Sequence, residues 1–225
     1  MIMIAAALPV EIAPLRQRAL PGVSLAALGM GREAVEKELK ALLEAQRPEL
    51  LISAGFAGGL QPDLKAGDAI LAERLRSEDG QEIEIEEELF HRASRAAVYC
   101  HSGSLLTVSR PARTIEEKDR LRREHAALAV DMESFWGAAA ARACRVPFLA
   151  VRAILDPLEC SLPAFIESLD PRGHWSWRTA LALARRPWQL GSLAQLAGAA
   201  RPASRRLALA LEALVSAFAV EVARC

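Results

Sequence analysis

The sequence predicts an α/β fold built on a central, largely parallel sheet. Through the first two-thirds of the 225 residues, short apolar runs alternate with longer segments in which apolar residues recur at helical spacing. Strands that alternate with helices are typical of parallel sheets, because parallel neighbours need long crossover connections. From about residue 160 the composition shifts to Ala, Leu and Arg, which predicts a C-terminal segment made of helices.

The individual elements follow from apolar runs bounded by Gly, Pro or polar residues. The expected strands are 1–8, 23–28, 49–55, 68–75, 81–89, 96–102, 128–132 and 147–155, of which 81–89 and 96–102 are the more exposed. The expected helices are 10–19, 32–46, 113–126 and 135–144. Thr114 is the expected N-cap of the third helix.

Composition excludes several classes of protein. The 28 basic residues balance the 28 acidic ones, so net charge gives no reason to expect a nucleic-acid partner. The four cysteines lie far apart without a C-x-x-C pair, which indicates a reducing cytosol and no metal site of that kind. The apolar N-terminus lacks a basic leader and predicts a first core strand rather than a signal peptide, and no apolar run reaches the roughly 18 residues of a membrane-spanning helix. The sequence therefore predicts a cytoplasmic protein.

Two glycine motifs follow predicted strands. "GMGREA" (29–34) fits a dinucleotide-binding turn, an ordinary tight turn into a helix, or an anion site at a helix N-terminus. The dinucleotide interpretation lacks the acidic residue after the next strand, because Glu49 stands at the start of that strand and not after it. "SAGFAGGL" (53–60) is expected to turn directly after a strand. Both motifs are expected at the carboxyl edge of the sheet, where ligands of α/β proteins bind.

Three carboxylates interrupt the apolar stretch "ALAVDMESFWGAAAARACRVPFLAVRAILD" (127–156). Asp131 and Glu133 could be first-turn helix carboxylates favoured by the helix dipole, and Asp156 could be a turn residue before a proline. Their position at the same sheet edge as the glycine motifs favours a shared site.

Four segments carry a resemblance to one family. They are "AALPVEIAPL" (6–15), "GMGREA", "LLISAGFAGGLQPDLKAGDAIL" (50–71) and the stretch from 129 to 156, in the family's order and spacing. On these segments the chain resembles the purine nucleoside phosphorylase and 5′-methylthioadenosine/S-adenosylhomocysteine nucleosidase superfamily. The resemblance implies a single-domain α/β/α sandwich with a central mixed, largely parallel sheet. It also implies an enzyme that cleaves N-ribosidic bonds and acts as a dimer or larger homo-oligomer.

The resemblance also implies roles for single residues. Asp156 would be the general acid that protonates the purine, a role that needs a pKa raised by burial. Glu133 would bind the ribose hydroxyls, Met132 would pack against the ribose, and Glu11 would orient a nucleophilic water. Asp131 is expected to be structural. Further substrate-binding candidates are Phe56, Ala57, Gly58 and Thr107.

Three departures from the family pattern concern the phosphate and the base. Phe56 replaces a small hydroxyl residue, Leu155 replaces a serine near the base, and no "GDP-x-R" phosphate loop is present. Inorganic phosphate is therefore retained only as a possible co-substrate, with Gly31 and Arg32 as the local candidates for binding it. No other cofactor is expected.

The C-terminal part, 161–225, is expected to be a helical extension packed on the core of 1–160. Its sequence resembles the hopanoid-associated phosphorylase subfamily, which implies release of adenine from adenosylhopane. Trp175, Trp177 and Trp188 among arginines could form a peripheral membrane contact at the inner face of the membrane, or simply pack on the domain or a partner subunit.

The favoured hypothesis is an enzyme that acts on this lipid-linked nucleoside. The alternative is a hydrolase of small soluble adenine nucleosides such as methylthioadenosine or S-adenosylhomocysteine. A third hypothesis is a non-catalytic nucleoside-binding protein.

Overall fold

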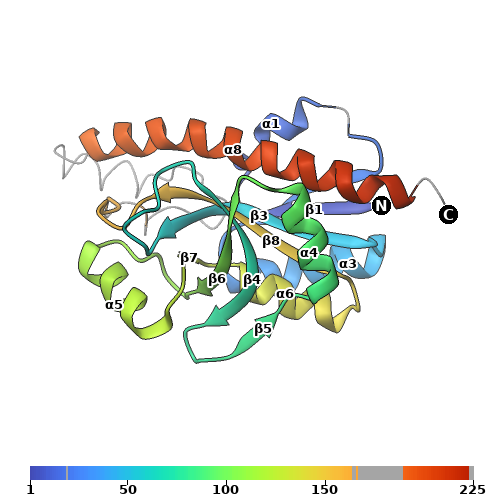
Figure 1. The fold of residues 1–225 in the computed structure, drawn as a ribbon, viewed down its shortest axis with the longest axis horizontal. Coiled ribbons are helices and arrows are strands. Elements are labelled where there is room, and N and C mark those ends of the chain that lie inside the picture. Colours follow the sequence, from blue (N-terminus) through green and yellow to red (C-terminus); the bar gives the residue numbers. More distant parts are fainter. Residues whose placement is uncertain (19, 164–165, 167–189, 223–225) are drawn as a thin grey trace.

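The protein is described here from a computed structural model, which describes residues 1–18, 20–163, 166 and 190–222. These residues form one eight-stranded sheet with helices against it (Figure 1). The strands are β1 (Ile2–Ala6), β2 (Val23–Ala27), β3 (Leu50–Gly59), β4 (Ala69–Ser77), β5 (Glu82–Glu84), β6 (Cys100–Thr107), β7 (Ala129–Asp131) and β8 (Phe148–Asp156). The helices are α1 (Ala13–Arg16), α2 (Arg32–Ala34), the π-helical segment η1 (Val35–Leu39), α3 (Lys40–Gln46), α4 (Glu87–Ala96), α5 (Ile115–His125), α6 (Ser134–Ala143) and α8 (Leu190–Val222).

The sheet is mixed, and its parallel half positions the site. The strand order is β2-β1-β3-β7-β6-β4-β5, and β8 pairs with both β3 and β4. Strands β2, β1, β3 and β8 run parallel to one another, whereas β7 and β4 meet their neighbours β3 and β8 antiparallel. The carboxyl ends of the four parallel strands therefore share one edge. The predicted α/β class with a mixed, largely parallel sheet is confirmed.

The strand β3 is longer than the sequence suggested. A glycine-rich turn was expected after residue 55, but the strand continues to Gly59. The reason lies in the space beside it: a methyl group at Gly55 would stand 2.9 Å from Glu11 Oε1, and one at Gly58 would stand 3.2 Å from Asp156 Oδ2. These glycines therefore make room for acidic side chains rather than for a turn. By contrast, Gly29 and Gly31 have positive φ and form the expected tight turn before the helical run of 32–46.

The middle of the chain contains one further correction. The segment 81–89 was expected to be an exposed strand, but only β5 is extended and α4 begins at Glu87. Acidic residues in the first turn and Arg95 in the last turn suit the helix dipole, which the alternation of Glu and Ile obscured. The expected strand 96–102 consequently begins only at Cys100. Thr114 caps α5 as expected, through a capping box with Glu117.

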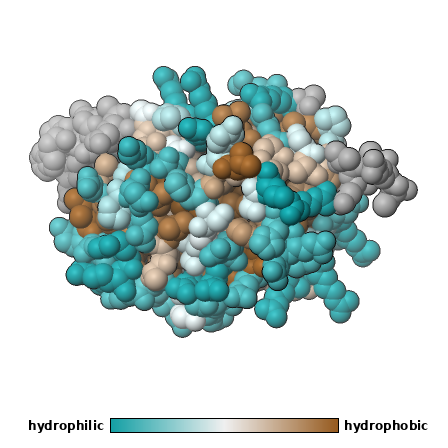
Figure 2. All heavy atoms as spheres, in the orientation of Figure 1, coloured by the Kyte–Doolittle hydropathy of each residue, from teal (hydrophilic) through white to brown (hydrophobic). Residues whose placement is uncertain are grey.

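The long helix α8 covers one face of the sheet, while α3 and α6 lie on the other side (Figure 1). Apolar residues of α8 belong to the same core cluster as β1, β3, β4 and β8. Figure 2 shows that the surface in this view is mostly hydrophilic, with small apolar patches scattered among the hydrophilic groups. Within the described ranges no helix is long and apolar enough to cross a membrane. The division of the chain near residue 160 stays a prediction. Those α8 residues that are buried in the core cluster are Ala203, Leu207, Ala208, Ala210, Leu211, Leu214, Val215 and Phe218.

Candidate active site

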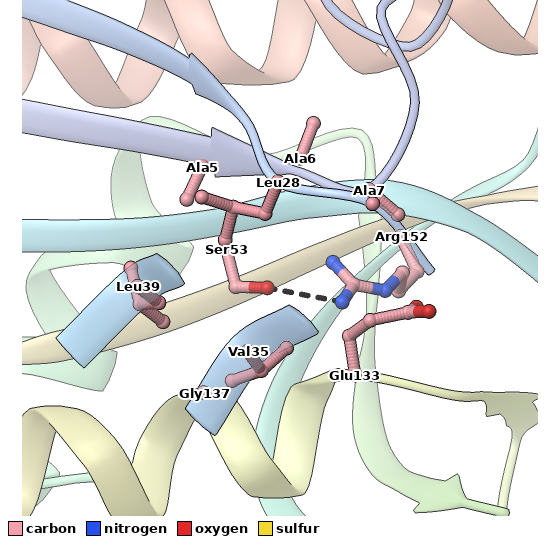
Figure 3. Close-up of a pocket in the computed structure, with 11 residues that line it drawn as sticks. Ala5, Ala6, Ala7, Leu28, Val35, Leu39, Ser53, Glu133, Gly137 and Arg152 are labelled. Atoms are coloured by element: carbon pink, nitrogen blue, oxygen red, sulfur yellow. Dashed lines mark hydrogen bonds between the residues drawn. The ribbon is translucent and has the colours of Figure 1, made fainter. Parts of the chain in front are cut away.

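Arg152 is the centre of a buried polar network on β8. Its side chain is almost completely buried. Its Nε donates to Asp131 Oδ2 at 2.7 Å, and its Nη2 donates to Ser53 Oγ at 3.0 Å. Its Nη1 donates to the carbonyl of Val151 at 3.1 Å. Because a buried guanidinium needs partners for its charge and its hydrogens, this network holds Arg152 in one orientation. Figure 3 shows the bond to Ser53 at the wall of a cavity.

Asp131 ties this arginine to the start of α6. Besides Arg152, it accepts hydrogen bonds from the hydroxyl of Thr107 at 2.7 Å and from the N–H of Ser134 at 3.1 Å. Thr107 Oγ1 in turn accepts from the N–H of Phe135 at 2.9 Å. The structural role expected for Asp131 fits these contacts. Thr107, a candidate substrate ligand, is buried, and its hydroxyl is bonded within this network rather than directed at a ligand.

Glu11 enters the same region from the segment that follows β1. It is buried and accepts hydrogen bonds from the N–H of Leu8 at 2.6 Å and from the N–H of Phe56 at 2.8 Å. Burial raises the pKa of Glu11, while these backbone N–H groups and the charge of Arg152 act in the opposite direction. The carboxylate is therefore anchored at the middle of β3, where Gly55 leaves space for it.

Glu133 precedes α6 and reaches back to the first glycine motif. Its Oε1 accepts a hydrogen bond from the N–H of Gly31 at 2.7 Å, although 102 residues separate the two. Burial raises the pKa of Glu133, and the negative charge of Asp131 raises it further, against the lowering effects of Arg152 and the Gly31 N–H. Met132 lies beside the same turn, with its Cε 3.9 Å from the position of a methyl group on Gly31. The residues expected at the ribose therefore meet at one place.

Three carboxylates surround one guanidinium in this part of the molecule. Glu11, Asp131 and Glu133 influence one another or are opposed by Arg152, so the cluster carries an excess of potential negative charge. A cavity of about 10 Å³ adjoins it, enough for roughly one water molecule. Figure 3 shows Glu133 and Arg152 on the same side of this cavity. The cavity is lined by Ala5, Ala6, Ala7, Leu28, Gly29, Val35, Leu39, Ser53, Glu133, Gly137 and Arg152.

Asp156 forms a second acidic position at the end of β8. The pairing of β3 with β8 shifts register after Ala57, so that Asp156 rather than Leu155 lies opposite Gly58. Its Oδ2 lies 2.5 Å from Nζ of Lys118 in α5. Burial raises the pKa of Asp156 to about 6, although the charge of Lys118 lowers it. Asp156 does not line the cavity of Figure 3 and lies about three strand positions, or ~10 Å, beyond Arg152's partner on β3.

The candidate phosphate ligands are engaged within the protein. The N–H of Gly31 donates to Glu133, as described above. Arg32 donates from Nε to Glu36 at 2.6 Å, and its guanidinium lies 4.0 Å from the centre of the Trp136 ring. An anion would have to displace these contacts, so their assignment to phosphate stays a prediction and loses support. No cluster of metal-ligating side chains occurs in the described part of the chain.

The remaining substrate candidates lie on β3. Phe56 is partly buried against the core, and its N–H donates a hydrogen bond to Glu11. Ala57 is buried. Gly58 adjoins the pair of Asp156 and Lys118. These three consecutive residues therefore connect the two acidic positions.

Sequence reasoning missed three polar residues of the site, namely Arg152, Ser53 and Lys118. Arg152 was visible as a lone charge in the middle of an apolar strand, which is a strong sign of a buried ion pair. Lys118 lies one helical turn before Leu121 and is buried with it, in a helix that otherwise looks solvated. Ser53 carried no such signal.

An α/β sheet with buried acids at the carboxyl edge of its strands is typical of proteins that bind a ligand at that edge. Residues 20–172 match the family model of the Phosphorylase superfamily, and the chain belongs to this superfamily. Futalosine hydrolase of Streptomyces coelicolor is 28% identical over 181 residues, which cover 72% of this chain and 72% of the relative. The 5′-methylthioadenosine/S-adenosylhomocysteine nucleosidase of Haemophilus ducreyi is 30% identical over 183 residues, covering 72% of this chain and 79% of the relative.

Solved structures agree with the fold. The 5′-methylthioadenosine/S-adenosylhomocysteine nucleosidase of Neisseria meningitidis, in complex with methylthio-immucillin-A, superposes with a TM-score of 0.75 at 18% identity, covering 96% of this chain and 99% of that one. Futalosine hydrolase of Helicobacter pylori superposes with a TM-score of 0.68 at 19% identity, covering 94% and 97%. The chain is thus an enzyme of the nucleosidase and phosphorylase class, which cleaves N-glycosidic bonds. The hopanoid subfamily stays a prediction.

Proposed function

We propose that this enzyme hydrolyses the N-ribosidic bond of small adenine nucleosides and releases adenine. Named relatives that are nucleosidases and hydrolases support this proposal over the adenosylhopane reaction that the sequence first favoured. In this proposal the roles that the resemblance implies are kept: Asp156 protonates the departing base, Glu133 binds the ribose hydroxyls, and Glu11 orients the attacking water. Met132 packs against the sugar.

The charges of the site suit this reaction. Cleavage builds positive charge on the ribose and negative charge on the base. Burial raises the pKa of Glu133 to about 8, and the positive charge that develops on the sugar would favour loss of its proton. The resulting carboxylate would stabilise the sugar, because charges interact strongly in a buried region. Asp156 retains part of its protons near neutral pH, because burial raises its pKa to about 6, and it could donate a proton to the base.

One observation carries the choice of water over phosphate. Three carboxylates face a single guanidinium, and that guanidinium already bonds to Asp131 and Ser53. A phosphate dianion would have to compete for this guanidinium, and burying its two charges without a matching cation is unfavourable. A neutral water meets no such penalty, and Glu11 can accept its proton.

Adenosylhopane remains a second candidate substrate. Phe56 and Leu155 are apolar where relatives carry hydroxyl groups, which would suit a greasy substituent. The tryptophans that prompted a membrane contact (Trp175, Trp177 and Trp188) lie outside the described residues. The membrane contact and a homo-oligomeric assembly stay predictions.

Adenine release separates these possibilities. Purified enzyme is assayed with methylthioadenosine and with adenosylhopane, each with and without inorganic phosphate. The proposal expects rapid release from methylthioadenosine, free ribose product, and no dependence on phosphate. Phosphate-dependent release with a ribose 1-phosphate product would replace hydrolysis by phosphorolysis. Turnover confined to adenosylhopane, with flotation on anionic liposomes, would establish the lipid reaction instead.

A further inference from the structure

Lys118 is buried in a place where a lysine needs an explanation. Lys118 belongs to α5, in which the other charged residues are exposed or partly exposed. The side chain of Lys118 is 0% exposed. Burying an ammonium group is costly unless its charge and hydrogens are both matched. The partners of Lys118 must therefore account for its position.

Backbone carbonyls fix the ammonium group. Nζ donates to the carbonyl oxygens of Asp156 at 3.0 Å, Pro157 at 2.8 Å and Cys160 at 2.8 Å. These three acceptors match its three hydrogens. Asp156 Oδ2 lies 2.5 Å from Nζ and forms an ion pair with it in addition to these three bonds. The cation is thus held by the backbone, whether or not Asp156 carries a proton.

We propose that Lys118 is a positioning residue for the general acid. It holds Oδ2 of Asp156 in place, leaves Oδ1 for the base, and stabilises the carboxylate that forms when the proton leaves. This inference rests on the proposed function, because it takes Asp156 as the acid. In the step itself, the proton of Asp156 passes to the ring nitrogen of the base, the electrons of the C1′–N bond pass to the base, and water adds to C1′ with loss of a proton to Glu11.

A cation that stays in place during this step acts as a prearranged charge. Burial raises the pKa of Asp156 and Lys118 lowers it, so the two effects together keep the group near the range of a useful acid. A methyl group at Gly58 on β3 would lie 3.2 Å from Asp156 Oδ2 and 3.3 Å from Val130 on β7, so this side of the carboxyl is packed against uncharged residues. Cys160 contributes its carbonyl to the same lysine.

Lys118→Gln removes the charge while keeping hydrogen-bond donors for the carbonyls. The acid must be protonated to act, so activity falls as pH rises through its pKa. Without Lys118 that pKa rises, so the alkaline limb of the kcat–pH profile for methylthioadenosine should move up by one unit or more. The maximal rate should fall about ten-fold, since the carboxylate loses its stabilising charge. Lys118→Arg should keep the wild-type limb, and Lys37→Gln on the exposed surface is the matched control.

Each outcome decides one of the two proposals. A limb that stays in place in Lys118→Gln, with or without loss of rate or thermal stability, overturns the role of Lys118. If Asp156→Asn retains turnover, the proposed function fails instead, whatever Lys118 does. If Lys118→Gln does not fold, the double variant with Asp156→Asn is compared: recovery of folding supports charge coupling within the pair. Failure of both variants to fold would show that Lys118 serves only the carbonyls and would overturn the inference.

Discussion

The two acidic positions at the sheet edge are built on opposite principles. Around Arg152, three carboxylates share one guanidinium and are fixed largely by backbone N–H groups. At the end of β8, one carboxylate faces one ammonium that is itself fixed by carbonyls. In the proposed reaction, acidic groups that ionise beside a positive sugar would stabilise it, whereas a carboxyl group paired with an ammonium suits a group that must lose a proton. In this reaction the first position would serve the sugar and the second would serve the base.

The substitution with the largest expected effect on this comparison is Asp156→Asn. It removes the proton donor but keeps the size of the side chain. We expect adenine release to fall by about 10² to 10⁴, the usual worth of a general acid. Binding of a non-hydrolysable nucleoside should change little, as measured by calorimetry. The exposed Asp63→Asn serves as control. Unchanged turnover would refute the role of Asp156.

Arg152→Met tests the other position through stability. It leaves buried carboxylates without their shared cation, which should lower the free energy of unfolding by about 3–5 kcal/mol. Urea denaturation measures this change. Arg142→Met, on an exposed position of α6, should stay within about 0.5 kcal/mol. A loss as small as that of the control would mean that the carboxylates do not depend on Arg152.

The pH dependence of stability sharpens the comparison. Because the folded pKa values of Glu11, Glu133 and Asp156 are raised, the folded state holds protons more tightly than the unfolded state. The resulting stabilisation is complete below about pH 4 and is lost as pH rises through the folded pKa values. For Asp156 this window runs from about 4 to about 6 and corresponds to ~3 kcal/mol at most. Chemical denaturation between pH 4 and 8 should show falling stability from these groups.

Glu133→Gln should weaken ribose binding and raise the stability of the protein. The neutral amide can still accept from the N–H of Gly31 but avoids the burial of a charge beside Asp131. We expect a higher melting temperature than wild type at pH 8, a smaller difference at pH 5, and weaker ribose binding at both. An equal melting temperature at pH 8 would contradict a raised pKa.

Thr107→Val has the smallest expected effect. It removes a hydroxyl that donates to Asp131 and accepts from Phe135, at a cost of about 1–3 kcal/mol in unfolding free energy. The Michaelis constant should be little changed, because the hydroxyl is bonded within the protein. A large rise in that constant with stability unchanged would restore Thr107 as a substrate ligand.

The sequence predicted the structure well where residues of the same segment determine it. The helical repeat of 32–46, the cap at Thr114, the strand–helix junction at Glu133 and the strand end at Asp156 are local patterns, and each was predicted. The length of β3 could not be predicted, because its glycines leave space for side chains from distant parts of the sequence, such as Glu11. Lys118 was missed for a similar reason. Its carbonyl partners follow β8, about forty positions later.

The strand β3 lies between Glu11 and Asp156, the two residues to which the proposed reaction gives the water and the base. A methyl group at Gly55 would press on Glu11 and leave the far acid untouched, whereas one at Gly58 would press on Asp156 and Lys118. In the proposed reaction, Gly55→Ala would therefore disturb the attack of water, whereas Gly58→Ala would disturb the release of the base. Kinetic isotope effects at C1′ and at the leaving nitrogen can be compared between Gly55→Ala and Gly58→Ala. The comparison would show whether the bond to water forms before or after the bond to the base breaks.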